Sequence, residues 1–186
     1  MARKKITKAG LRSFNLKMAG LHGVQALAIF LLAKDFTVPV STSFLTFNSI
    51  TKTLEPATKT LFNLPLAWLI VAFLALSAIA HLVIATVYNK QYNRGLSKGM
   101  NQARWIEYSL SASTMMVAIS LLVGIYDLSL LIGIFALVAF MNLMGLVMEV
   151  HNQTTEKTNW LSYVIGCIAG IIPWLIVGLS FWGSAT

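Results

Sequence analysis

Five long apolar stretches limit most strongly what this chain can fold into. They cover about residues 12–34, 63–88, 101–125, 128–150 and 160–183. A helix needs roughly 20 mostly apolar residues to cross a bilayer core of about 30 Å, so each stretch is long enough to span a membrane. The chain is 57% hydrophobic and 11% charged, which is far more apolar than a soluble domain of 186 residues requires. These features predict an all-α transmembrane helix bundle that forms a single membrane domain over residues 1–186.

The connections between the apolar stretches differ in character. Residues 35–62 are rich in Thr, Ser, Val and Phe with a rough alternation, which favours a short β-hairpin. Residues 89–100 form a polar basic loop, residues 126–127 a tight turn, and residues 151–159 a polar loop. Short connections place consecutive helices antiparallel, so the bundle is predicted to run up and down.

The basic residues predict how the bundle is oriented. The net charge of +8 would suggest nucleic acid in a soluble protein, but here the positive residues cluster between apolar spans. A cytoplasmic N-terminus leaves only Lys34, Lys52 and Lys59 outside. The other eleven Lys and Arg residues are then cytoplasmic: Arg3, Lys4, Lys5, Lys8, Arg12, Lys17, Lys90, Arg94, Lys98, Arg104 and Lys157. We therefore predict a multi-pass plasma-membrane protein with a cytoplasmic N-terminus, an extracellular first loop and no nucleic-acid partner.

Three ionisable residues on three spans fall at a similar depth. At 1.5 Å per residue, Glu107 lies roughly 9 Å, His81 roughly 10 Å and His22 roughly 15 Å from the cytoplasmic ends of their spans. Placing such a group inside a membrane costs about 2.5–3.5 kcal/mol, so a functional role is the first interpretation. The shared depth predicts a hydrated polar cavity. The alternatives are an ion pair between Glu107 and Arg104, and histidines that only pack and hydrogen-bond.

The third span carries a regular stripe of side chains. Glu107, Ser111 and Met115 stand at positions i, i+4 and i+8, with Tyr108 and Thr114 beside them. A carboxylate at one end and methionine at the other suit a long ligand with a cationic head and an apolar body. The same pattern also suits a helix-packing face whose Ser and Thr hydroxyls bond to their own backbone. The spacing leaves both interpretations open.

The fourth and fifth spans indicate close packing. In the fourth, Met141, Gly145 and Met148 share one face and Asn142 and Glu149 another, with Glu149 near enough to the cytoplasmic end to snorkel or to meet a basic loop residue. The fifth contains a GxxxG pair, Gly166 and Gly170, and a lone cysteine, Cys167, that is predicted to pack between helices. Pro173 is predicted to bend the helix, so that Trp174 faces inward or toward lipid.

The sequence lacks the common motifs of soluble enzymes. The sequence contains no Walker loop, no HExxH, no GxSxG and no Cys/His spacing for a metal. We therefore predict that the protein is not an enzyme and holds no metal.

The segments "RWIEYSLSASTMM" and "GCIAGIIPW" carry a family resemblance. Together with His22, His81 and the Ser/Thr-rich first loop, they resemble the heliorhodopsins over the whole chain. The resemblance implies a seven-helix rhodopsin fold, inverted in the membrane relative to ordinary microbial rhodopsins. It also implies all-trans retinal, bound as a protonated Schiff base to a lysine of the seventh helix.

The resemblance assigns roles to residues of this chain. Glu107 is the Schiff-base counterion, and His22 and His81 line a hydrated cavity and handle protons. The residues expected against the chromophore are Tyr108, Ser111, Met115, Met141, Gly145 and Trp174.

The resemblance also implies a function and partners. It indicates a light sensor or regulator with a slow photocycle that is not an ion pump, forms a homodimer and acts on a cytoplasmic signalling partner. A light-driven or passive ion or proton transporter and a non-photoactive membrane scaffold or regulator are the alternatives. No lysine of the chain sits deep in a span, since Lys17 and Lys34 both lie close to span ends. We therefore expect helices six and seven, with the retinal-linking lysine, beyond Thr186; the alternative is a five-helix relative unable to bind retinal covalently.

Overall fold

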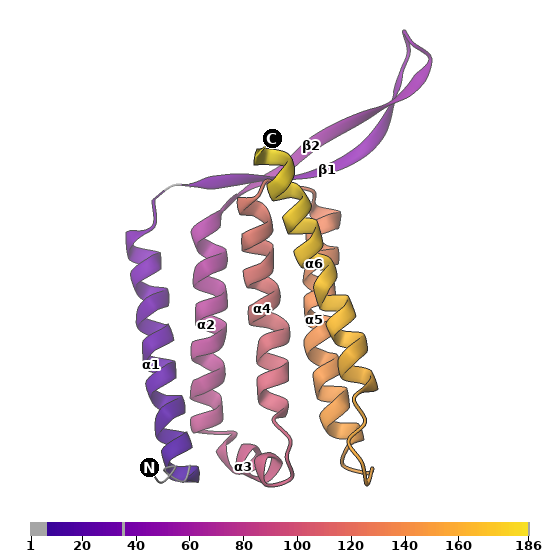
Figure 1. Cartoon of the computed structure of the whole chain (residues 1–186). Coiled ribbons are helices and arrows are strands. Elements are labelled where there is room, and N and C mark those ends of the chain that lie inside the picture. The colour runs from indigo at the N-terminus through magenta and orange to yellow at the C-terminus, as the bar shows by residue number, and fades with distance from the viewer. Residues whose placement is uncertain (1–6, 35, 186) are drawn as a thin grey trace.

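Six helices and one two-stranded hairpin make up the part of the chain that the structure describes. The computed structural model describes residues 7–34 and 36–185. Five helices are long and apolar enough to cross a membrane, and the exception is the short α3. This confirms the predicted transmembrane helix bundle (Figure 1). In chain order the elements are α1 (Lys8–Leu32), β1 (Thr37–Asn48), β2 (Thr53–Pro65), α2 (Leu66–Ala85), α3 (Asn89–Ser97), α4 (Gln102–Leu122), α5 (Leu128–His151) and α6 (Leu161–Ala185).

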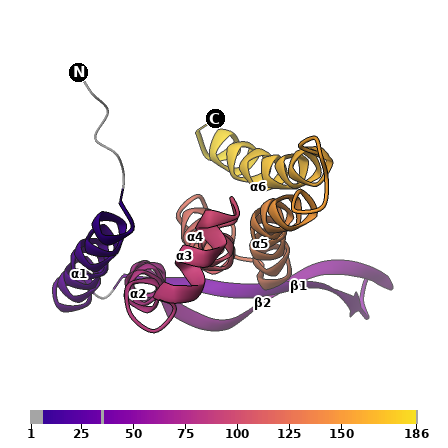
Figure 2. The ribbon, with the colours of Figure 1, turned by 90° about the horizontal axis from the view of Figure 1, so that it is seen from below.

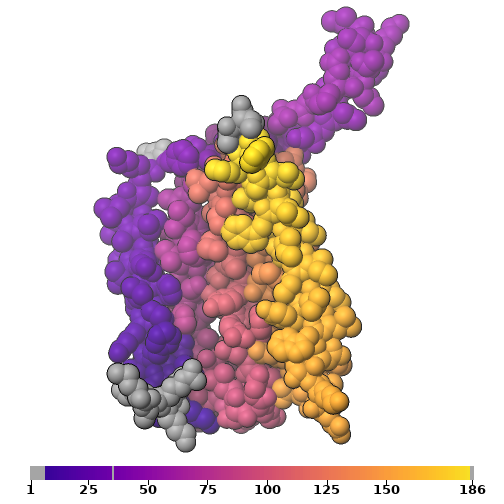
Figure 3. All heavy atoms as spheres, in the orientation of Figure 1, coloured from indigo at the N-terminus to yellow at the C-terminus, as the bar shows by residue number. Residues whose placement is uncertain are grey.

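The long helices form an open arc. The helix α1 packs on α2, α2 on α4, α4 on α5, and α5 on α6. Viewed along the bundle, α1 and α6 stand at the two ends of this arc (Figure 2). Figure 3 shows the open side, with α6 in front at one edge and α1 at the other. The bundle thus has an α3 end, where the chain begins, and a hairpin end (Figure 1).

The hairpin is longer than predicted. Its strands pair antiparallel from Thr37 opposite Pro65 to Asn48 opposite Thr53, with a bulge between Val40 and Ser41. Because β2 extends to Pro65, the second span begins at Leu66 and not at residue 63. The apolar side chains at the base of β1, Val38 and Val40, are buried in the core and hold the hairpin on the bundle. The remaining helix ends differ from the predicted boundaries by a few residues, as fraying ends do.

The prediction of a loop over residues 89–100 is wrong for most of that segment. Residues Asn89–Ser97 form α3, which lies across the end of the bundle (Figure 1). Its formation follows from amphipathicity, because Tyr92 is buried whereas Lys90 and Arg94 are exposed. The segment is too short and too polar to give a span-like signal in the sequence.

The contact between α5 and α6 confirms the predicted close approach at the GxxxG pair. A Cβ atom added at Gly166 would lie 2.9 Å from the Met141 carbonyl oxygen, and one at Gly170 would overlap the Met141 side chain. Pro173 lies inside α6 and is fully buried. Cys167 is exposed, so the prediction that it packs between helices is wrong for the contacts within this chain.

Asp127 joins the hairpin to the bundle. Its Oδ1 accepts hydrogen bonds from the backbone N–H groups of Ser129 (2.9 Å) and Leu130 (3.2 Å), which caps the first turn of α5. Its Oδ2 accepts a bond from the Ser43 N–H at 2.9 Å. One carboxylate therefore fixes both the start of a span and the strand that crosses it.

Replacing Asp127 with Ala is expected to lower the melting temperature at neutral pH. The N–H of Leu130, followed by the Ser43 donors, lowers the pKa of the Asp127 carboxyl. A carboxyl with a lowered folded-state pKa contributes its full stabilisation above its ordinary pKa, and the contribution is lost as pH falls through the lowered value. The melting difference between wild type and Asp127→Ala should therefore disappear in acid. A difference that persists at low pH, or one matched by Glu156→Ala in the exposed α5–α6 loop, would contradict this role.

Candidate functional site

Glu107 on α4 is held by two hydroxyl groups. The Ser77 Oγ of α2 donates to Glu107 Oε1 at 2.6 Å, and the Ser111 Oγ donates to the same oxygen at 2.8 Å. The Oε2 atom accepts no hydrogen bond from the described residues, and the side chain is half-buried. One carboxylate oxygen is thus fixed, while the other remains available to a donor.

The other hydroxyls of α4 behave as the packing interpretation predicts. Ser109, Ser113, Thr114 and Ser120 each donate to a backbone carbonyl three or four residues earlier. Ser111 alone among these α4 hydroxyls turns to the carboxylate. The helix-packing interpretation therefore applies to Ser109, Ser113, Thr114 and Ser120, whereas Ser111 belongs to the polar site around Glu107.

The two histidines are connected to each other and to α1. The His81 Nδ1 lies 2.7 Å from the Asn15 Oδ1, and the Asn15 Nδ2 donates to the Leu11 carbonyl. Since the Asn15 oxygen faces His81 and can only accept, the His81 Nδ1 carries a proton, and Nε2 has no hydrogen bond to the described residues. The His22 ring stacks on the His81 ring with centroids 5.8 Å apart, and its Nδ1 lies 3.0 Å from the Gln25 Oε1.

A polar cavity of about 170 Å³ opens between α1, α2, α3 and α4. It has room for ordered water, which needs several polar partners in its walls. His22 does not line it but stacks on a residue that does. Its polar lining consists of Asn15, His81, Tyr92, Asn101, Arg104, Glu107 and Tyr108.

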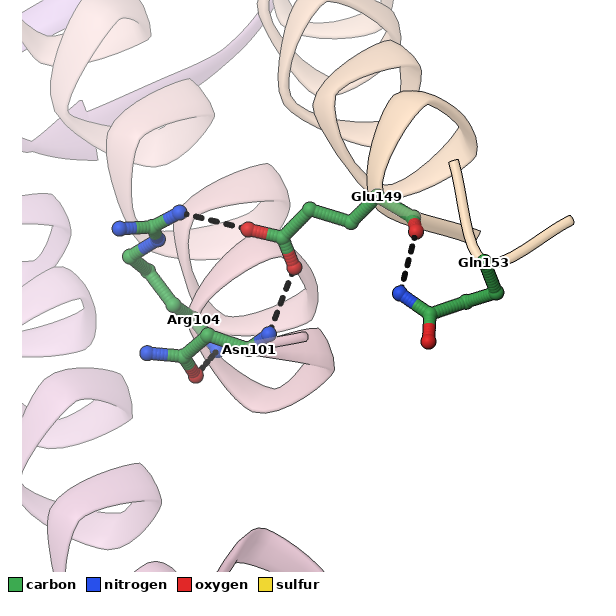
Figure 4. Close-up of polar contacts among 4 residues, drawn as sticks. All are labelled: Asn101, Arg104, Glu149 and Gln153. Carbon is green, nitrogen blue, oxygen red and sulfur yellow. Dashed lines mark hydrogen bonds and ion pairs between the residues drawn. The ribbon is translucent and has the colours of Figure 1, made fainter. Parts of the chain in front are cut away.

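Arg104 pairs with Glu149 and not with Glu107, so the alternative of a Glu107–Arg104 pair is wrong. Its Nη2 lies 3.0 Å from Glu149 Oε1, and the Asn101 N–H donates to Glu149 Oε2 at 2.6 Å (Figure 4). The Gln153 Nε2 donates to the Glu149 carbonyl at 3.1 Å. The basic partner of Glu149 thus lies in the first turn of α4 and not in a loop, as was predicted, and this cluster ties α4 to α5 at the α3 end.

The residues predicted to contact the ligand fall into two groups. Tyr108 and Met115, 47% and 38% exposed, share the side of α4 that carries Ser111. Met141 and Gly145 instead pack between helices: Gly145 lies against the Trp105 ring, and Met141 lies against α6. Trp174 is 56% exposed on α6. The structure brings Glu107, Ser111, Tyr108, His81 and His22 into one cluster and leaves Met141, Gly145 and Trp174 on the α5–α6 side.

Sequence reasoning missed three members of the cluster. Ser77, Asn15 and Gln25 supply partners to Glu107, His81 and His22. Helical spacing could have indicated two of them. Ser77 stands four residues before His81, and Gln25 stands three residues after His22, so each shares a helix face with a histidine.

Long apolar helices around a half-buried carboxylate and two histidines define a multi-pass membrane protein with a polar site inside the bundle. The chain belongs to the heliorhodopsin family, whose family model, Heliorhodopsin, matches residues 11–186. No curated protein matches the chain. The family places it among retinal-binding, photoreceptor-type membrane proteins and not among conventional enzymes, and retinal and its Schiff base follow from this membership.

The residues present fit one side of a Schiff-base site. A protonated Schiff base needs an anionic acceptor in a low-dielectric setting, and Glu107 has an uncommitted oxygen beside a polar cavity. No lysine lines the polar cavity, and α2, α4, α5 and α6 contain none.

Proposed function

We propose that the protein is a light-sensing retinal photoreceptor with a slow photocycle and a signalling role, in which Glu107 is the Schiff-base counterion. When bound, all-trans retinal supplies light absorption and a protonated Schiff-base nitrogen. The observation that carries the proposal is the asymmetry of the carboxylate: Ser77 and Ser111 hold Oε1, and Oε2 is left for the cation. The two hydroxyls orient the carboxylate before the ligand arrives, so little reorganisation is needed.

The histidines serve as the proton-handling part of the site. The free Nε2 of His81 is an acceptor, and its Nδ1–H is held by Asn15. The His22 ring, stacked on His81, extends this part of the site toward α1. Protons released near Glu107 thus remain within the cavity at the α3 end, where they change the charge that a partner on that surface meets.

The remaining pocket residues are proposed to wrap the apolar body of the ligand. Tyr108, Ser111 and Met115 line it from α4, and Trp174 is free to approach it from α6 because its side chain is exposed. Met141 and Gly145 act through the close α4–α5–α6 packing that sets the shape of the wall.

The α3 end is proposed to face the cytoplasm of a plasma-membrane protein. Basic residues gather there, including Lys90, Arg94, Lys98 and Lys157. At the other end, Lys34 precedes the hairpin, and Lys52 and Lys59 lie within it. Arg3, Lys4 and Lys5, which also support this orientation, lie outside the described residues. Signalling to a cytoplasmic partner then occurs at the α3 end. We further propose a homodimer, since much apolar surface on α5, α6 and the hairpin is exposed.

Illumination of cells that contain the protein should give no sustained pH change. The polar cavity is lined from the α3-end half of the bundle, while the buried serines Ser113 and Ser120 toward the hairpin end are satisfied by backbone carbonyls. This arrangement supports a sensor over a transporter, because the residues that the structure describes offer no continuous polar path. The measurement is the pH of a lightly buffered suspension in light and dark. A sustained signal that a protonophore abolishes would reject the sensor in favour of a light-driven transporter.

A further inference from the structure

A second hollow, of about 350 Å³, lies between α2 and α4. It shares Glu107, Ala80 and Ile84 with the polar cavity but otherwise uses different faces of the two helices. Its walls are almost entirely apolar, with Tyr88 at one end. The apolar side chains that distinguish it from the polar cavity are Leu76, Ile79, Val83, Ala103, Ile106 and Leu110.

This groove opens to the surroundings of the bundle. Ile79 and Ile106 stand on its two sides and are 59% and 52% exposed. Exposed aliphatic side chains in the middle of membrane-spanning helices face hydrocarbon. The groove is therefore accessible from the bilayer and does not depend on access from water.

The length of the groove matches one leaflet. From Leu76 to Ile84 the lining of α2 runs eight residues, or about 12 Å along the helix axis. Half of a bilayer core is about 15 Å. Tyr88, in the turn between α2 and α3, closes the end of the groove at the depth where amphipathic aromatic rings meet headgroups.

Positive charge stands beside that closed end. The helix α3 begins at Asn89, directly after Tyr88, and carries Lys90 and Arg94 with exposed side chains. Residues 86–103 contain no Asp or Glu to neutralise them. A basic segment at the membrane surface attracts anionic headgroups, at about 1 kcal/mol per Lys or Arg.

We propose that the groove between α2 and α4 binds one acyl chain of an anionic phospholipid from the leaflet at the α3 end, with its phosphate at Lys90 and Arg94. The acyl chain lies along Ile79 and Ile106 and passes Glu107 on the α4 wall. Because Glu107 lines both hollows, the lipid covers the side of the carboxylate that faces away from the polar cavity and keeps water from it. This inference does not rest on retinal binding.

Native mass spectrometry of the protein released from vesicles of equal parts phosphatidylglycerol and phosphatidylcholine tests the groove. The wild type should retain one phosphatidylglycerol. Ile106→Trp fills the groove with an indole ring and should lose this lipid. Ile168→Trp is the matched control, because Ile168 is 60% exposed on α6, away from the groove, and it should retain the lipid. Ile79→Trp provides a second filling variant from the α2 side. Equal retention by the wild type and both filling variants, with unchanged helical circular dichroism, would overturn the proposed site.

The same measurement tests the headgroup contact. The Lys90→Gln/Arg94→Gln variant should reduce the preference for phosphatidylglycerol over phosphatidylcholine about fivefold per charge removed, the ratio that corresponds to ~1 kcal/mol. The Lys52→Gln/Lys59→Gln variant of the hairpin is the control and should keep the preference. If the wild type retains both lipids equally, or retains only neutral detergent in the groove, an anionic phospholipid is not the occupant.

Discussion

Replacing Glu107 with Gln is expected to shift the visible band of the retinal-loaded, full-length protein to the red and to lower the Schiff-base pKa. In the proposed role, the carboxylate stabilises the positive charge that is localised on the Schiff base in the ground state. Its loss would therefore lower the excitation energy. An opposite charge at contact distance shifts a pKa by about 1–3 units, and the Gln variant should lose a shift of this size. The measurement is an absorbance titration with base.

Two variants separate the counterion from its surroundings. Glu149→Gln removes a carboxylate that pairs with Arg104 and has no contact with Glu107, so the band and the Schiff-base pKa should remain close to wild type. Ser77→Ala removes one of the two hydroxyls on Oε1 and should give a smaller shift than Glu107→Gln. An unchanged spectrum in Glu107→Gln would remove Glu107 from the counterion role.

Replacing Gly166 with Leu is expected to destabilise the bundle strongly. Even a Cβ atom at this position would lie 2.9 Å from the Met141 carbonyl oxygen and 2.9 Å from the Met144 Cβ. The first of these atoms is backbone, so α6 has to move away from α5 to admit a larger side chain. Overpacking lowers the free energy of unfolding by about 1–3 kcal/mol. Because a whole helix has to move in this variant, we expect a loss at the upper end of that range. The measurement is the free energy of unfolding in mixed micelles.

Gly178→Leu on the same helix is the matched control. A Cβ atom there meets nothing within 4 Å. Both substitutions gain helix propensity of about 1 kcal/mol, so the difference between the two variants isolates the α5–α6 contact. Equal unfolding free energies for the two variants would show that the close approach at Gly166 contributes nothing to stability.

The sequence predicts the spans and the polar cluster well for physical reasons. A span requires a long apolar run, and an ionisable group inside one is conspicuous, so Glu107, His22 and His81 could be found by depth alone. Ser77 and Asn15 were not predicted as members of the polar cluster, because small polar residues are common in membrane helices. Their importance depends on which helix faces them.

Features set by tertiary contact were the hardest to predict. The α3 helix is stabilised by the burial of Tyr92 and has too few residues for a strong periodic pattern. The contact of Gly145 with the Trp105 ring depends on how α4 and α5 are rotated against each other, which no spacing along one helix reveals. Arg104 had two acidic candidates in reach, and only the packing of α5 on α4 shows that Glu149 is its partner.

The most direct test of the photoreceptor proposal is the absorbance of the purified full-length protein after addition of all-trans retinal. A retinal photoreceptor should show a visible band, well to the red of free retinal, that bleaches when base deprotonates the Schiff base. The band should respond to Glu107→Gln and not to Glu149→Gln. A protein that stays colourless with retinal, while its helical content and melting temperature remain those of a folded bundle, would contradict the photoreceptor proposal.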